Sequence, residues 1–297
     1  MLISDVSFFL TASGNWFMFE IAQIFAEGFE QNGISTQIVT DFIPSSQLEV
    51  GKIQIIVAPH EFYPLFLEKK ISLKEIQNIT EACYFLTVEQ PGSSWFEIAF
   101  QYSKWARGVF DINMQGVDEF RQRGVKAFYS PLGYSKTLEA VNINPKQVNS
   151  VEKPIDILFL GSNSPRRESF LAKYAYFFNK YQSKLIISRV ERPRKVNTPG
   201  FYSGSERNQI LQRSKILINI HFGDRTYLEW HRFLICAANR CLLISELSDR
   251  VEPLINGKHF ILTELDKIPI ICEYYLNHQD ELREIADQAY AFIKQEY

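Results

Sequence analysis

Short apolar runs alternate with amphipathic segments along the whole chain. In the first half, apolar runs predict strands at residues 3–11, 36–40, 53–59, 82–88, 109–113 and 125–130. Helical spacing of apolar positions predicts helices at 17–31 and 95–105. The runs at 53–59 and 82–88 are almost continuously apolar, as in strands that are covered on both faces. This alternation predicts a parallel sheet with helices on both sides.

The same alternation restarts after a segment that differs in composition. Residues 131–154 contain three prolines and few large aliphatic residues, which indicates a linker. Beyond it we expect strands at 155–160, 184–189, 216–220 and 241–245, helices at 164–181, 206–213 and 227–239, a polar loop at 192–205, and a mostly helical end.

We therefore predict an α/β protein with two Rossmann-like domains that face each other across a cleft. The domains would span residues 1–133 and 154–297, joined by a linker at 134–153. A chain of 297 residues fits two domains of roughly 100–200 residues each. Ligands of such folds bind at the carboxyl ends of the strands, which here would line the cleft.

Composition excludes several classes of protein. A hydrophobic content of 46% excludes disorder, and a net charge of -2 without a basic run argues against nucleic acid as a partner. Four cysteines without a CxxC pair indicate reduced thiols and a cytoplasmic location. The apolar start contains Asp5 and no basic residue, so we expect a buried strand rather than a signal peptide. No stretch approaches the ~20 apolar residues of a membrane span.

Several catalytic signatures are missing from the sequence. It contains no GxxxxGK[ST], no HExxH, no GxSxG, no Asp-x-Asp pair, and no GxGxxG after the first strand of either half. The five histidines show no metal-ligand spacing. We therefore expect no metal and no cofactor, and any nucleotide chemistry would be metal-independent.

The clearest local signal opens the second half. A predicted strand ends at Gly161, Ser164 suits an N-cap, and Pro165 suits the first helical position, so Arg166 and Arg167 fall in the first helical turn. A helix N-terminus favours binding of an anion, and two guanidinium groups at the same place strengthen that preference. The combination points to a diphosphate. The alternative is an ion pair with a surface carboxylate.

A second signal follows the strand predicted at 216–220. Glu229 and Arg232 are three residues apart and share a helix face. The carboxylate suits the two hydroxyls of a ribose, and the guanidinium suits a phosphate or a sugar hydroxyl. The spacing alone slightly favours an ordinary helical ion pair. The position after the end of a strand favours ligand binding.

The first half offers three weaker candidates. Gly14 and Asn15 form a turn that either brings backbone N–H groups to a ligand or merely connects strand to helix. His60 and Glu89 each follow a predicted strand, where either side chain can accept a proton from an acceptor hydroxyl. A lone histidine is more often structural, so that alternative stays open.

Taken together, these segments resemble the GT-B glycosyltransferases, and specifically the CgeB-like, spore-maturation-type group. Residues 156–171, 214–246, 253–261 and 274–293 carry most of the resemblance. Residues 14–33, 58–64, 88–96 and 130–134 add a less specific part. The resemblance implies two Rossmann-like domains, with the nucleotide sugar bound mainly by the second, the acceptor held by the first, and a final helix that crosses back to the first domain.

The resemblance also assigns roles to individual residues. The diphosphate would face Gly161, Arg166 and Arg167, and the ribose would face Glu229. Arg232 would contact a phosphate or the donor sugar, and the loop around Tyr202 would approach the base. Asn219 and His221 would line the pocket wall.

The sequence departs from the group at two positions. Many relatives have a glutamate where this chain has Leu234 and a glycine where it has Asn239. The usual ribose contact would then pass to Glu229, and the stereochemical outcome stays open.

The leading hypothesis is a metal-independent hexosyltransferase that moves a sugar from a UDP-sugar, or another nucleotide sugar, to a glycan, small molecule or protein. Two alternatives remain: a nucleotide-sugar epimerase on the same fold, and a non-catalytic module that binds a sugar nucleotide or a protein.

Overall fold

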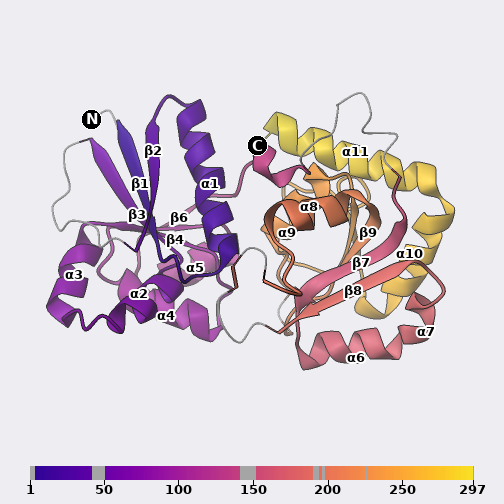
Figure 1. The fold of residues 1–297 in the computed structure, drawn as a ribbon, viewed down its shortest axis with the longest axis horizontal. Coiled ribbons are helices and arrows are strands. Elements are labelled where there is room, and N and C mark those ends of the chain that lie inside the picture. The colour runs from indigo at the N-terminus through magenta and orange to yellow at the C-terminus, as the bar shows by residue number, and fades with distance from the viewer. Residues whose placement is uncertain are drawn as a thin grey trace. The chain divides into compact units, whose positions relative to one another are not determined.

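The computed structural model describes residues 4–41, 51–140, 152–189, 194–195, 198–224 and 226–296. The chain divides into two compact units (Figure 1). Unit 1 contains Met1–Gly133 and Pro193–Lys195, and unit 2 contains Tyr134–Arg192 and Val196–Tyr297. Each unit is built on a parallel β-sheet, so the predicted α/β class is confirmed.

Unit 1 holds a six-stranded sheet in the order β2-β1-β3-β4-β5-β6. Its strands are β1 (Asp5–Leu10), β2 (Ser35–Thr40), β3 (Lys52–Val57), β4 (Tyr84–Thr87), β5 (Val109–Asp111) and β6 (Ala127–Tyr129). Its helices are α1 (Trp16–Gln31), α2 (Pro59–Leu67), α3 (Leu73–Glu81), α4 (Ser94–Ser103) and α5 (Met114–Gln122). The strand order reverses between β1 and β3, where such sheets bind ligands.

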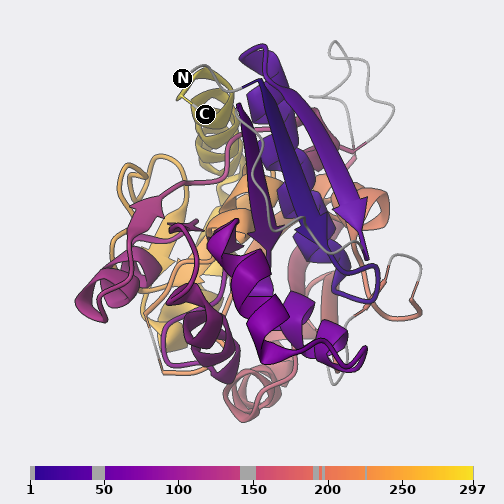
Figure 2. The ribbon, with the colours of Figure 1, turned by 90° about the vertical axis from the view of Figure 1, so that its left-hand side faces the viewer.

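Packing in unit 1 follows from its apolar pattern. Phe8, Ile56 and Phe85 on the central strands are buried, and Phe96 of α4 packs on Phe120 of α5 with ring centroids 4.6 Å apart. Figure 2 shows α1 running along the sheet beside β1 and β2, which it contacts. The apolar side chains are thus packed in the core, and polar side chains lie in the loops at the carboxyl ends of the strands.

The strand predicted at 53–59 is too long. It ends at Val57, because Ala58 adopts a φ of 50° and Pro59 opens α2. α2 contains Pro64 and only nine residues, so it gives little helical periodicity. The hydrophobic pattern of the sequence therefore does not distinguish this short helix from the strand that precedes it.

Unit 2 holds a five-stranded sheet in the order β11-β10-β9-β7-β8. Its strands are β7 (Ile155–Ser162), β8 (Ser183–Ser188), β9 (Ser214–Asn219), β10 (Leu242–Glu246) and β11 (Ile261–Thr263). Its helices are η1 (Lys136–Leu138), α6 (Pro165–Lys173), α7 (Ala175–Phe178), α8 (Gly204–Gln212), α9 (Trp230–Ala238), η3 (Leu265–Lys267), α10 (Ile268–Asn277) and α11 (Gln279–Glu296). Here the order reverses between β7 and β9.

Three predictions for unit 2 need correction. The helix at 164–181 is broken at Tyr174 into α6 and α7, and the helix at 227–239 begins only at Trp230. The mostly helical end also contains β11, which is only three residues long and pairs with β10. Such a short strand leaves no alternating pattern to detect.

Residues 134–140, which we had assigned to the linker, pack within unit 2. Nδ2 of Asn239 donates to the carbonyl of Leu138 at 2.8 Å, and Oδ1 accepts from the amide of Ala140 at 3.0 Å. The hydroxyl of Tyr290 donates to Glu139 at 2.8 Å. Asn239, which replaces a glycine of the resembled group, therefore fixes this segment. Residues 141–151 of the predicted linker lie outside the described residues.

The last helix, α11, packs against α9, α10 and β10 of its own unit. Its crossing toward unit 1 stays a prediction. Within the described parts of the chain, no helix combines the length and the apolar composition that a bilayer span requires.

Candidate active site

In unit 2, Arg167 bridges the point where the strand order reverses. Its Nη1 donates to the carbonyl and hydroxyl oxygens of Ser162 at the end of β7, both at 3.1 Å. Its Nε donates to the carbonyl of Ile220, directly after β9, at 2.8 Å. The guanidinium is buried, so it joins the ends of the two strands from inside.

The local sequence explains how Arg167 reaches this position. The hydroxyl of Ser164 accepts from the amide of Arg167 at 3.2 Å, and Pro165 occupies the first position of α6. This confirms the predicted helix start. A Cβ on Gly161 would lie 2.9 Å from the ring of Phe159 and 3.1 Å from Nη1 of Arg167, so the guanidinium needs a glycine there.

Glu229 lies between two arginines. Its Oε1 is 3.2 Å from Nη2 of Arg167, and its Oε2 is 2.6 Å from Nη2 of Arg232. Burial would raise the pKa of Glu229, but the guanidiniums of Arg232 and Arg167 outweigh it and lower the pKa to about 2. The helical ion pair allowed by the spacing is therefore present, and it stands at the carboxyl end of the sheet. Arg232 also donates to the carbonyl of Leu160.

Arg166 is paired with Glu246, which was not among the site residues predicted from the sequence. Nη1 and Nη2 of Arg166 lie 2.7 and 2.6 Å from the two oxygens of Glu246. The Glu246 side chain is 4% exposed, and it also accepts from the amide of His221. The Arg166 side chain is 28% exposed. Glu246 ends an apolar strand, which is the criterion that selected Glu89, so the sequence did contain a signal for it.

Arg166, Arg167, Arg232, Glu229 and Glu246 form one cluster, called the arginine cluster below. Three guanidiniums gather beside the N-terminus of α6, where the helix dipole also favours an anion. They face two carboxylates within the cluster, and the exposed carboxylate of Asp224 lies 3.9 Å from Nε of Arg166. The arrangement is suited to holding an anion.

The remaining residues predicted for the donor lie around this cluster. Asn219 ends β9, and its Nδ2 donates to Ser245 at 2.9 Å. Its Oδ1 is buried and has no hydrogen-bond partner among the described residues, which is costly unless a ligand or water supplies a donor. Nε2 of His221 lies 3.0 Å from the carbonyl of Leu247. Tyr202 is half-buried, and part of the loop before it lies outside the described residues.

In unit 1, Glu61 holds the turn between β1 and α1. The amide of Asn15 donates to its Oε2 at 2.9 Å, and Nδ2 of Asn15 donates to its Oε1. A Cβ on Gly14 would lie 2.5 Å from that carboxylate. The amide of Arg194, which belongs to this unit, donates to Oδ1 of Asn15 at 2.8 Å. The polar groups of Asn15 are thus used within the protein, as a connecting turn requires.

The two candidate bases of unit 1 lie together. Nε2 of His60, at the start of α2, is 3.3 Å from Oε1 of Glu89, which follows β4. Burial lowers the pKa of His60 to about 4, so the imidazole is neutral. Because a carboxylate only accepts, this contact favours the proton on Nε2. Nδ1 is then an acceptor, and it is buried without a partner among the described residues.

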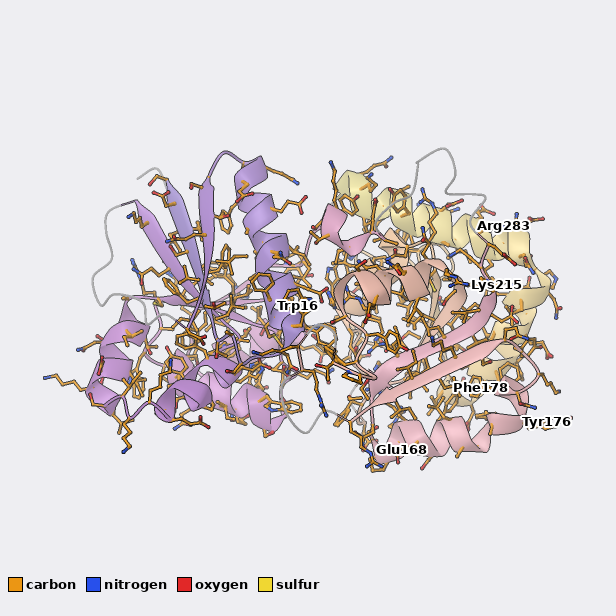
Figure 3. All side chains as sticks on the ribbon, viewed as in Figure 1. Trp16, Glu168, Tyr176, Phe178, Lys215 and Arg283 are labelled. Carbon is orange, nitrogen blue, oxygen red and sulfur yellow. The ribbon has the colours of Figure 1, made fainter. Side chains whose placement is uncertain are left out.

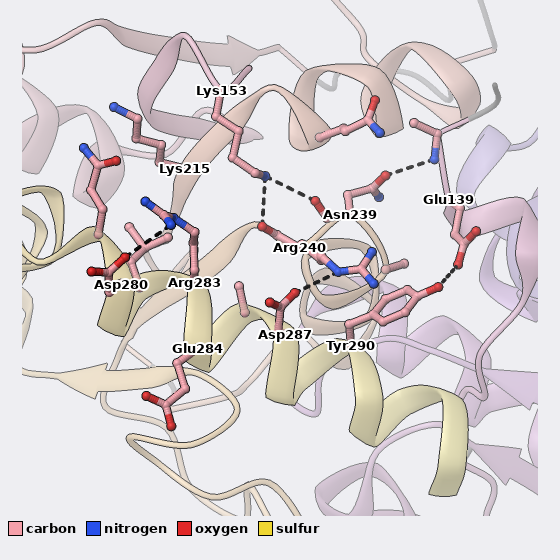
Figure 4. Close-up of a pocket in the computed structure, with 16 residues that line it drawn as sticks. Glu139, Lys153, Lys215, Asn239, Arg240, Asp280, Arg283, Glu284, Asp287 and Tyr290 are labelled. Atoms are coloured by element: carbon pink, nitrogen blue, oxygen red, sulfur yellow. Dashed lines mark hydrogen bonds and ion pairs between the residues drawn. The ribbon is translucent and has the colours of Figure 1, made fainter. Parts of the chain in front are cut away.

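A cavity of about 730 Å³ lies elsewhere in unit 2 (Figure 4). Its lining includes Lys153 before β7, Lys215 on β9 and Arg240 before β10, together with α11. These positions mark the amino-terminal ends of the strands. The cavity is therefore at the opposite edge of the sheet from the arginine cluster.

No family model matches the chain, and no curated protein matches it. Solved structures do match. HepE from Anabaena, in complex with UDP and glucose, superposes with a TM-score of 0.62 at 12% identity, over 98% of this chain and 95% of that one. The chain has the GT-B fold. The narrower resemblance to the CgeB-like group is not confirmed by these comparisons.

Two further structures share the GT-B fold with this chain. An alpha-glucosyltransferase in complex with UDP and a 13-mer DNA gives a TM-score of 0.61 at 9% identity, covering 98% of this chain and 95% of that one. Sucrose-phosphate synthase from Thermosynechococcus elongatus gives 0.59 at 8% identity, covering 98% and 94%. At such low identity, the likeness concerns the fold.

Proposed function

We propose that the chain is a metal-independent glycosyltransferase that moves a hexosyl group from a UDP-sugar to an acceptor hydroxyl. Unit 2 would bind the donor and unit 1 the acceptor. The observation that carries the proposal is the arginine cluster, which stands where GT-B and related sheets bind ligands and brings three guanidiniums to the N-terminus of α6. Two of the structures that share the fold contain UDP, which supports uracil as the base of the donor.

The two neighbouring arginines have different roles in this proposal. All three guanidinium nitrogens of Arg167 donate within the protein, to Ser162, Ile220 and Glu229, so Arg167 positions the edge of the sheet. Arg166 is partly exposed and oriented by Glu246, so it is the arginine that contacts the diphosphate. As the bond from C1 of the sugar to the diphosphate breaks, Arg166 and the start of α6 stabilise the negative charge on UDP.

In unit 1, His60 would accept the proton of the acceptor hydroxyl at Nδ1. Glu89 acts through His60: it holds the proton on Nε2 and stabilises the imidazolium that forms. In this proton transfer Glu89 is therefore a positioning residue, and its loss would alter the pH profile of kcat/KM as well as its size.

Titration calorimetry with UDP, combined with turnover of UDP-sugars, tests this function. We expect Arg166→Ala to weaken UDP binding by at least about tenfold, since it removes a charge-assisted contact worth roughly 1.5–3 kcal/mol. Because Arg166→Ala leaves Glu246 buried and unpaired, the double variant Arg166→Ala/Glu246→Gln is measured beside it. Arg283→Ala, at a 65% exposed side chain on α11, is the control and should bind UDP normally (Figure 3).

Unchanged UDP binding in the folded double variant would overturn the donor assignment. Analysis of the sugar recovered from the donor separates the alternatives. An inverted sugar in the absence of any acceptor would indicate an epimerase, and binding of UDP-sugar without turnover would indicate a non-catalytic module.

A further inference from the structure

The strand ends of the two units differ in charge. In unit 2, β7, β8, β10 and β11 are each followed within five residues by an arginine or lysine. In unit 1, no strand is followed within five residues by either, and the residues that follow or end its strands include Asp41, Glu61, Glu89 and Asp111. Phosphate groups are bound by cations and helix N-termini. The segments that follow the unit 1 strands therefore offer a phosphate helix N-termini but no cationic side chain of their own.

Two described cations of unit 1 come from outside these segments and lie near the turn after β1, while other lysines follow or begin helices. Arg194 and Lys195 join the unit beside Asn15, and the backbone of Arg194 bonds to Asn15 and Trp16. Lys69, Lys70 and Lys74 follow or begin helices rather than end strands. None of them belongs to the segments that carry His60 and Glu89.

Three of the four carboxyl groups are bound by groups of their own unit. Glu61 binds Asn15, and Asp41 accepts from the hydroxyl of Thr11 at 3.2 Å and from the amide of Ala12 at 3.0 Å. Asp111 accepts from Thr87 at 2.7 Å and from the amide of Asn113 at 2.8 Å. Glu89 also has partners in the protein, His60 among them, but 20% of its side chain remains exposed. The unpartnered Nδ1 of His60 adds an acceptor at the same place. A partly exposed carboxylate in contact with an imidazole that has a second acceptor nitrogen suits a ligand that brings hydroxyl donors.

An exposed tryptophan follows Glu89 after one tight turn. The amide of Ser93 donates to the carbonyl of Gln90 at 3.1 Å, and Gly92 has a φ of 82°. Ser93 then caps α4, whose first turn carries Trp95 with 46% of its surface exposed. An exposed aromatic face six residues after a partly exposed carboxylate offers the combination that holds a sugar ring, since the ring's C–H face is apolar and its rim is polar.

We propose that the acceptor is an uncharged carbohydrate, bound at the carboxyl ends of the unit 1 strands with one ring against Trp95 and a hydroxyl directed to Glu89 and His60. This inference rests on the proposed function. The acceptor oxygen forms the new bond to C1 of the donor sugar, the bond from C1 to the diphosphate oxygen breaks with its electron pair, and the hydroxyl proton goes to Nδ1 of His60. UDP leaves with the negative charge.

Competing acceptors of matched size test the proposal. The protein is given UDP-glucose together with a neutral oligosaccharide, the same oligosaccharide carrying a phosphate, an amino-sugar analogue, or a hydroxymethylated oligonucleotide. We expect the neutral form to be used with at least about tenfold higher kcat/KM than the charged forms. Preferred transfer to the phosphorylated sugar, the amine or the nucleic acid would overturn the inference.

Variants of Trp95 test where the sugar ring of the acceptor binds. Trp95→Ala should raise KM for the neutral acceptor by about five- to tenfold while kcat and UDP affinity stay within twofold, and Trp95→Phe should restore most of the loss. Tyr176→Ala is the control for loss of an exposed aromatic, because this side chain is 78% exposed and lies at the outer side of unit 2 (Figure 3). An acceptor KM that does not change in Trp95→Ala would contradict the proposed platform.

A binding measurement separates this inference from the proposed function. Saturation-transfer NMR detects the neutral oligosaccharide on the protein without any donor, and Trp95→Ala should weaken that signal. If UDP fails to bind, the proposed function fails. If UDP binds and its sugar is transferred only to charged acceptors, the function stands and this inference is wrong.

Discussion

Residues adjacent in the sequence have different surroundings in this protein, and the difference decides what each one does. Arg166 and Arg167 both begin α6, yet Arg167 is buried against backbone carbonyls while Arg166 remains partly exposed against Glu246. A buried guanidinium with most of its donors in use holds structure together. A partly exposed one keeps the ability to meet a ligand.

We expect Arg167→Ala to lower the free energy of unfolding by about 3 kcal/mol, because it removes the donors to Ser162 and Ile220 and one partner of Glu229. Arg167→Lys should not restore it, since an ammonium lacks the planar fork. Urea denaturation measures the loss. A fully stable Arg167→Ala that fails to bind UDP would instead make Arg167 a direct ligand.

At the scale of elements, the connections after the strands are fixed by buried polar groups. Glu61 fixes the turn from β1 to α1, Asn239 fixes residues 138–140, and Asp111 fixes the start of α5. A Cβ on Gly116 would lie 2.4 Å from Oδ2 of Asp111, so α5 approaches this carboxyl group as closely as a glycine permits. Glu61 and Asp111 thus position connections that directly follow a strand, whereas Asn239 holds the segment that follows η1.

Asp111 makes the stability of unit 1 depend on pH. Burial raises its pKa to about 7, against the hydrogen bonds from Thr87 and Asn113 that lower it. The folded state therefore holds a proton that the unfolded chain releases near pH 3.8, and stability falls as pH rises from about 4 to about 7. The hydroxyl of Thr87 also lies 3.2 Å from the carbonyl of Phe110, so a protonated Asp111 can donate to Thr87 while Thr87 donates onward.

Asp111→Asn should remove that pH dependence, because an amide stays neutral and can donate to Thr87. We expect the variant to match the wild type near pH 4 and to exceed it by at most about 4 kcal/mol at pH 8. Thermal or urea unfolding at both pH values measures the difference. Equal slopes of stability against pH in the two proteins would show that Asp111 ionises normally.

At the scale of the whole molecule, the sequence predicted the two parallel sheets because long apolar runs such as those of β3, β7 and β9 leave few alternatives. It also predicted the start of α6, since Ser164 and Pro165 are local signals. It did not predict the break at Tyr174 or the strand β11, which depend on packing and pairing rather than on pattern. Nor did it predict the pair of Arg166 and Glu246, which are 80 residues apart and meet only in the folded sheet.

The arginine cluster has a consequence for the catalysis of the whole protein. In the proposed reaction, Arg166 and the start of α6 supply the positive charge that a divalent metal supplies elsewhere, and the sequence has no Asp-x-Asp pair to hold such a metal with its nucleotide. Turnover of UDP-sugar should therefore stay within about twofold after exhaustive chelation, and added Mg²⁺ or Mn²⁺ should not raise it. Arg166→Ala/Glu246→Gln is the informative comparison, because a metal that coordinates the diphosphate directly can replace part of the missing charge there. A wild-type rate that collapses with chelator and returns with Mn²⁺ would mean that the guanidiniums do not neutralise the leaving group alone.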